Sequence, residues 1–256
     1  MFDERTLPED VAAVRAAHAP EALVLDCGTD FETLAPAQAE DLGLLVDSLD
    51  PSSFPESWLP EDAPELLGRY ASTDFTIGMP GDGSVAWTRQ TVPPTVFVKA
   101  RVQGSPDDFV EFLIAEALVE VGSDDPEHFL GFFGDRYADL DAALPFDAGS
   151  VYQIAAALYD AYRGLYTREI FADWADERPR LFEAWQDAGE RIEPRLDGLP
   201  GAMAREETDF AEAAEFACSA VKHGLELPAP FAALDTETYR DHGADYAVTW
   251  AEKTFA

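Results

Sequence analysis

Apolar and polar positions alternate along two stretches of the first half of the chain. This period of two predicts strands over 84–91 and 95–102, which we expect to pair through the turn at 92–94. A shorter apolar run, Ala22 to Leu25, and the run over 74–79 are further strand candidates. The pattern therefore predicts a small antiparallel sheet.

From Ser105 onward the apolar residues recur at helical spacing instead. Ser105 is an N-cap residue followed by Pro106 at the first helical position, and Gly122 is placed to end the helix over 106–121. The same reasoning predicts further helices over 8–18, 36–49, 149–166, 168–193, 206–223 and 236–253, and one opening at Asp125. The predicted fold class is α+β, mainly helical with a small antiparallel sheet.

The weakest joint in the chain is Pro194 to Arg205, which contains Gly198, Pro200 and Gly201 and is typical of a linker. Helix 206–223 nevertheless carries a narrow apolar stripe that needs another helix to cover it. We therefore expect a single domain over 1–256, with a mixed part over about 1–145 and a helical part over about 146–256.

Charge is the strongest compositional signal. Fifty-one Asp and Glu residues stand against 17 Lys and Arg, giving a net charge of −34 with a sequence pI near 4.1. The acids are spread through segments with clear hydrophobic periodicity, so a folded surface carries them. No basic stripe is available to release counterions from phosphates, which argues against nucleic acid and anionic membranes as partners.

Dispersed acid, arginine in place of lysine and abundant alanine resemble the proteins of salt-accumulating halophilic archaea. The resemblance implies a cytoplasmic protein that holds water and solvent cations at its surface. The N-terminus has no signal-peptide pattern, and no apolar run reaches 18 residues. Cys27 and Cys218 lack metal-type spacing, so we assign them no chemistry.

Helix 106–121 places its acids on two faces. Asp107, Asp108 and Glu111 cluster on what should be the wet face, whereas Glu116 and Glu120 share a sector with apolar side chains. Buried carboxylates need a compensating partner, which here could be an arginine, a metal ion, a shared proton or a water-filled cleft. Arg89 and Arg101 of the neighbouring sheet are the arginine candidates, and simple exposure on an acidic surface is the other alternative.

The run from Thr95 to Pro106, the segment from Phe112 to Val121 and the run from His128 to Phe132 together resemble a degenerate core of zincin metallopeptidases over 95–140. The resemblance implies a zincin-like fold in which Glu116, Glu120 and His128 occupy the metal-ligand positions. Two carboxylates and one imidazole would suit a divalent cation harder than zinc. Ala117 stands where the family has its general base, so the resemblance implies no peptidase chemistry.

Three function classes remain open. The first is a non-catalytic protein, structural or partner-binding, with a protein partner or a second copy of the chain as its target. The second is a zincin-like protein that binds a metal or small ligand, with a divalent cation as the candidate cofactor and metal-dependent hydrolysis as an alternative that no residue supports. The third is an enzyme of a class that the sequence does not disclose, and no catalytic residue is assigned.

Overall fold

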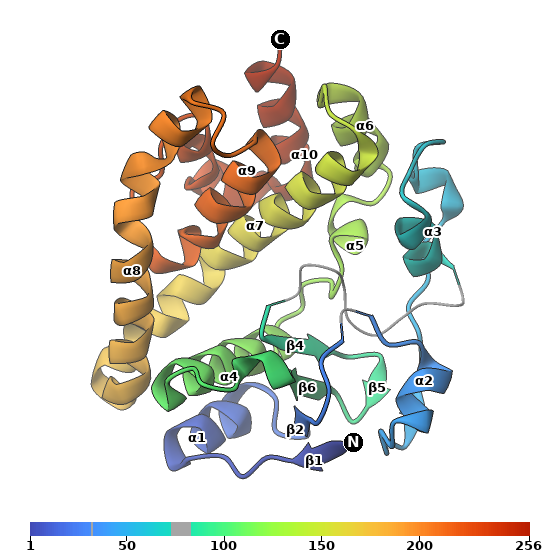
Figure 1. Ribbon diagram of the computed structural model, residues 1–256, viewed down its shortest axis with the longest axis vertical. Helices are drawn as coiled ribbons and strands as arrows, with labels where there is room; N and C mark the ends of the chain where they lie inside the picture. The colour runs from blue at the N-terminus through green and yellow to red at the C-terminus, as the bar shows by residue number, and fades with distance from the viewer. Residues whose placement is uncertain (32, 73–82) are drawn as a thin grey trace. The chain divides into compact units, whose positions relative to one another are not determined.

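The computed structural model of the chain describes residues 1–31, 33–72 and 83–256 (Figure 1). The chain divides into two compact units. Unit 1 comprises Met1–Phe54, Arg69–Glu127 and Arg178–Ala184, and unit 2 comprises Pro55–Gly68, His128–Glu177 and Trp185–Ala256. Residues 128–145, expected in the mixed part, thus group with the helical unit. The prediction of a single domain stays a prediction.

Unit 1 is built on a four-stranded sheet in the order β1-β2-β6-β4, with bounds β1 Phe2–Glu4, β2 Leu23–Cys27, β4 Val85–Thr88 and β6 Thr95–Val98. β4 and β6 are antiparallel, which confirms the predicted pair. β2, however, runs parallel to β6, so the sheet is mixed and the prediction of an antiparallel sheet is wrong in this respect. A long connection separates β2 from β6, and sequence alone does not give the direction in which such a connection returns. The strand expected over 74–79 lies outside the described residues.

Helices cover both faces of this sheet. α1 (Glu9–His18) and α4 (Asp107–Val121) pack together, and α4 contacts β4 and β6. Phe97 of β6 faces the opposite side, toward α2 (Pro36–Asp41). All four residues of β6 are buried, as expected for a central strand with both faces covered.

The remaining elements of unit 1 are short. β3 (Ser48–Leu49) and β5 (Thr91–Val92) form a separate two-stranded ribbon, and η2 spans Ala100–Val102. The helix predicted over 36–49 ends at Asp41, because Gly43 turns the chain with a φ of 87°. α3 (Glu65–Ala71) crosses from one unit to the other.

Unit 2 is helical, and α7 makes contacts with most of its other elements. Its elements are η1 Glu56–Trp58, α5 Phe129–Phe133, α6 Arg136–Ala143, α7 Ala148–Glu177, α8 Pro179–Ala204, α9 Phe210–Ser219, η3 Val221–His223, η4 Phe231–Leu234 and α10 Glu237–Thr254. The helices predicted over 206–223 and 236–253 are confirmed as α9 and α10, with α9 ending earlier. The helix expected to open at Asp125 begins instead at Phe129.

The break between the two longest helices differs from the prediction. Helices expected over 149–166 and 168–193 meet at Arg178, not at residue 167. A residue before proline disfavours helical backbone, and Pro179 therefore sets the break. Residues 178–184 after this break belong to unit 1, where Arg180 pairs with Asp10 of α1 at 2.7 Å.

The segment 194–205, whose composition is typical of a linker, is helical as far as Ala204 and forms the C-terminal half of α8. A proline inside a helix costs about 3 kcal/mol. α8 contains two, Pro194 and Pro200, and burial of Leu196 and Leu199, which are 2% and 6% exposed, offsets part of their cost. No helix in the described ranges has the length and apolar character that crossing a membrane requires.

Candidate functional site

The two glutamates of the predicted ligand set lie on the buried side of α4. Glu116 is 7% exposed and Glu120 is 9% exposed. Asp107 and Asp108, at the start of the same helix, are exposed. The helical periodicity therefore predicted the burial or exposure of these four side chains correctly.

Glu111 was expected on the solvent-exposed face of α4, but its side chain is largely buried. Its carboxylate pairs with the guanidinium of Arg180, and its side chain is only 14% exposed. Arg180 also pairs with Asp108 and Asp10, so three carboxylates from α1 and α4 share one guanidinium. The contact is tertiary, from a residue about 70 positions away in sequence, and helix periodicity carries no signal of it.

Glu120 has a partner that the sequence did not indicate. The indole Nε1 of Trp87, on β4, donates a hydrogen bond to Oε2 of Glu120 at 2.6 Å. The two arginines named as candidate partners have other contacts. Arg89 donates to the carbonyl oxygen of Ser123 at 2.7 Å, and Arg101 pairs with Asp30 at 2.7 Å.

A third acid, Glu127, completes what we call the β4–α4 polar cluster, consisting of Trp87, Thr88, Arg89, Gln90, Glu120 and Glu127. The Glu127 carboxylate accepts from Thr88 Oγ1 at 2.7 Å, from the backbone N–H of Arg89 at 2.8 Å and from Gln90 Nε2 at 2.6 Å. Burial raises the pKa of Glu127, and these donors and the Arg89 charge oppose that rise. Glu127 ties the loop after α4 to the end of β4.

Sequence reasoning missed Glu127. The residue stands in a loop with no periodicity, and its three donors come from residues 88–90. The one available signal was the polar run Thr88, Arg89 and Gln90 at the end of a strand whose earlier residues are apolar.

His128 belongs to unit 2, whereas Glu116 and Glu120 belong to unit 1. His128 is the N-cap of α5, and its Nδ1 accepts from the backbone N–H of Leu130 at 3.0 Å. The neutral ring therefore carries its proton on Nε2. Burial lowers the pKa of His128 to about 3, so the ring stays neutral at physiological pH.

This arrangement gives the predicted metal site no support. A histidine that binds a metal through one nitrogen usually donates a hydrogen bond from the other, but Nδ1 of His128 faces a donor. Across residues 1–31, 33–72 and 83–256, no three His, Cys, Asp or Glu side chains are grouped so as to hold a metal ion. The ligand set Glu116, Glu120 and His128 stays a prediction.

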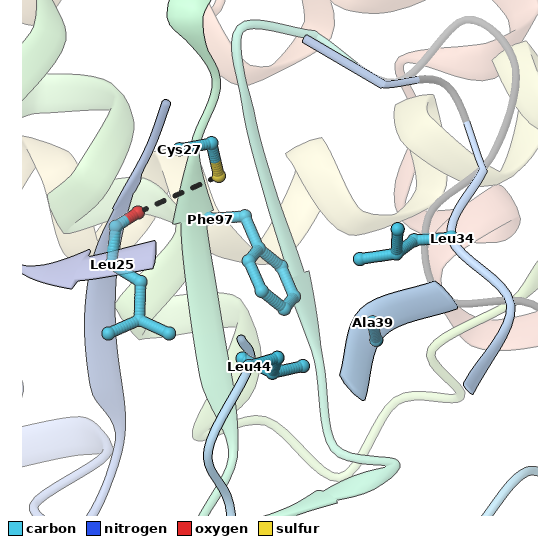
Figure 2. Close-up of a cluster of buried hydrophobic side chains, with 6 residues drawn as sticks. All are labelled: Leu25, Cys27, Leu34, Ala39, Leu44 and Phe97. Carbon is cyan, nitrogen blue, oxygen red and sulfur yellow. Dashed lines mark hydrogen bonds between the residues drawn. The ribbon is translucent and has the colours of Figure 1, made fainter. Parts of the chain in front are cut away.

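A second feature of unit 1 is apolar. Leu25, Cys27, Leu34, Ala39, Leu44 and Phe97 form a buried cluster between the sheet and α2 (Figure 2). Leu42, Val46 and Leu49 are partly buried against this cluster. Burial raises the pKa of Cys27 to about 12, so the thiol is an apolar member of the cluster and not a nucleophile.

Leu45 follows Leu44, a member of this cluster, but is itself exposed. Its side chain is 87% exposed, although Leu44 before it is 3% exposed. Val92 of β5 is 48% exposed, and its carbonyl oxygen accepts from the N–H of Asp47 at 2.7 Å. Because two residues span at most about 7 Å, Leu45 and Val92 lie on adjacent segments. We call Leu42, Leu45, Val46, Leu49 and Val92 the Leu45 surface.

The model of a family of unknown function, DUF7089, matches residues 1–256. The chain belongs to this family. No curated protein and no solved structure matches the chain. DUF7089 membership covers the polar cluster and the Leu45 surface together, and it assigns no reaction to either.

The zincin resemblance gains nothing from these comparisons for this DUF7089 member. Ala117, at the position where zincins have their general base, is 4% exposed in the interior of unit 1. The polar cluster around Glu120 and Glu127 connects the end of β4 to the end of α4 and the loop after it. The Leu45 surface is the other feature that a partner could contact.

Proposed function

We propose that this chain is a non-catalytic protein that binds a protein partner through the Leu45 surface, in a salt-rich cytoplasm. The observation that carries the proposal is the exposure of Leu45, at 87%, next in sequence to Leu44 of the apolar cluster of unit 1. Burying a leucine side chain contributes about 1.5–3 kcal/mol, and this side chain is positioned to bury that area against another molecule.

High salt favours the burial of an exposed leucine side chain. Salts that are excluded from protein surfaces raise the free-energy cost of exposed apolar area, so an acidic protein adapted to brine gains from covering its apolar side chains. Leu45 follows the turn at Gly43, which separates it from α2 and leaves it in the loop between α2 and β3. The loop keeps Leu44 in the core and directs Leu45 outward.

The polar cluster supports a non-catalytic role. The carboxylate of Glu127 is occupied by three hydrogen-bond donors, and Glu120 accepts from Trp87 at 2.6 Å. A general base needs a carboxylate within reach of a substrate proton. These carboxylates instead hold β4 and the end of α4 together.

Size-exclusion chromatography of the tagged chain, expressed in its native cells and extracted in molar KCl, tests this proposal. The wild type should elute in a complex larger than its own 28.0 kDa mass, and a Leu45→Ser, Val92→Thr double variant should elute as the lone chain. Ala16→Ser and Ala17→Ser, at exposed positions of α1 in the same unit, serve as the matched control. Identical elution of wild type and double variant would contradict the proposal.

A further inference from the structure

We infer that the partner presents an apolar recess flanked by lysine or arginine side chains. This inference rests on the proposed function, because it names the chemistry of the molecule that covers the Leu45 surface. It follows from the charges that flank Leu45 in sequence, and not from the net charge of the whole chain.

Exposed acidic side chains flank Leu45 in sequence. Glu40, Asp41, Asp47 and Asp50 are exposed on the segments that flank it. No lysine or arginine occurs in sequence between Arg15 and Arg69, although the chain has 17 such residues. On the Phe31 side of the apolar cluster, Arg101 pairs with Asp30 at 2.7 Å, and the ammonium of Lys99 lies 5.3 Å from the Phe31 ring. The described segment from Glu40 to Asp50 therefore exposes four carboxylates and contains no lysine or arginine.

Such a segment selects its partner by charge. A second copy of the chain would bring a second acidic segment against the first, and like charges in contact repel even when salt shortens the Debye length to about 3 Å at 1 M. A basic rim around an apolar recess would instead pair with Asp41 and Asp47 while Leu45 enters the recess. Apolar contact would supply affinity, and the charges would supply specificity.

Peptide titrations in 1 M KCl, followed by the backbone amide signals of unit 1, test this inference. The probes are three seven-residue peptides of alternating residues: arginine with leucine, glutamate with leucine, and arginine with serine. The arginine–leucine peptide should shift the amide signals of Leu45, Asp47 and Val92. Its Kd should rise about tenfold in Leu45→Ser, which is the loss expected for one leucine contact.

Charge variants supply the matched comparison. Asp41→Asn with Asp47→Asn should weaken the arginine–leucine peptide several-fold. Asp107→Asn with Asp124→Asn, which removes the same charge from exposed positions at the two ends of α4, should leave its Kd unchanged. The arginine–serine peptide should bind diffusely, with no dependence on Leu45.

The outcomes distinguish failure of the basic partner from failure of the proposed function. Equal binding of the glutamate–leucine peptide at the same amides would overturn the basic partner and leave the proposed function standing. A dimer of the chain that Leu45→Ser abolishes would also overturn the basic partner. If no leucine-containing peptide binds in a Leu45-dependent way, the Leu45 surface is not a docking site and the proposed function fails with it.

Discussion

Gly122, at the end of α4, lies directly against His18, the last residue of α1. A methyl group on Gly122 would stand 2.2 Å from the carbonyl oxygen of His18. The φ of Gly122 is −81°, so its backbone conformation suits any residue and only the close approach requires glycine. The contact fixes how closely the two helices pack on the sheet.

Gly122→Ala should therefore destabilise unit 1 by about 1–3 kcal/mol, because two backbones must separate to admit the methyl group. Urea unfolding in high salt measures the change. Gly68→Ala is the control, since Gly68 lies in α3 with nothing within 4 Å of the added methyl group. There alanine should stabilise by about 0.5–1 kcal/mol. A neutral Gly122→Ala would contradict the helix contact.

Glu127→Gln tests the polar cluster. The glutamine amide group must face one of the three donors, which leaves a buried N–H or O–H without its acceptor. We expect a loss of about 1–3 kcal/mol in the free energy of unfolding. Glu4→Gln, an exposed position on β1, makes the same charge change and should have little effect. Equal stability of the two variants would show that Glu127 does not hold the strand end to the helix end.

The sequence predicted the buried face of α4 correctly, but it gave no prediction for Glu127, and both results have the same physical reason. Helical periodicity encodes which face of α4 is buried, so Glu116 and Glu120 could be placed from the sequence alone. The partners Trp87 and Thr88 reach α4 and its loop through tertiary packing, for which no local pattern exists. Local rules gave helix faces, and they could not give contacts between distant segments.

Two further failures have the same origin. The parallel pairing of β2 with β6 depends on a crossover that turn signals do not describe. The helix continues through Pro194 and Pro200 against the local preference of proline, and the burial of Leu196 and Leu199 contributes tertiary packing that local rules do not encode. The exposure of Leu45 likewise depends on the loop that begins at Leu42, which replaces the helix predicted to reach residue 49.

His223 predicts a pH dependence in unit 2. Its Nδ1 lies 3.1 Å from the carbonyl oxygen of Trp185, and burial, assisted by the charge of Lys222, lowers the pKa of His223 to about 4. As the pH falls, the imidazole of His223 is therefore protonated in the unfolded chain at a higher pH than in the folded protein. The contribution of His223 to stability is complete above pH 6.5 and is lost as the pH falls toward 4.

His223→Asn keeps an amide donor for the Trp185 carbonyl and removes the titration. The free energy of unfolding of this variant should fall less steeply than that of the wild type between pH 6.5 and 4. His18 and His128, whose pKa values are also lowered, titrate equally in both proteins. Parallel pH profiles would contradict a buried, neutral His223.

The net charge of −34 predicts salt-dependent folding. Screening lengthens from about 3 Å at 1 M salt to about 10 Å at 0.1 M, so repulsion between the dispersed acids grows as salt is removed. Circular dichroism should show a helical protein in about 3 M KCl and loss of structure near 0.05 M. A spectrum and melting temperature that stay constant over this range would contradict adaptation to brine.

Site-specific photo-crosslinking in living cells tests most directly whether the Leu45 surface contacts a protein partner. A photoreactive amino acid at Leu45 should give one discrete adduct with a protein that carries a lysine- or arginine-rimmed apolar recess. The same amino acid at Ala16, an exposed position of α1 in the same unit, should not give that adduct. Absence of an adduct at Leu45, or the same products at both positions, would contradict the claim.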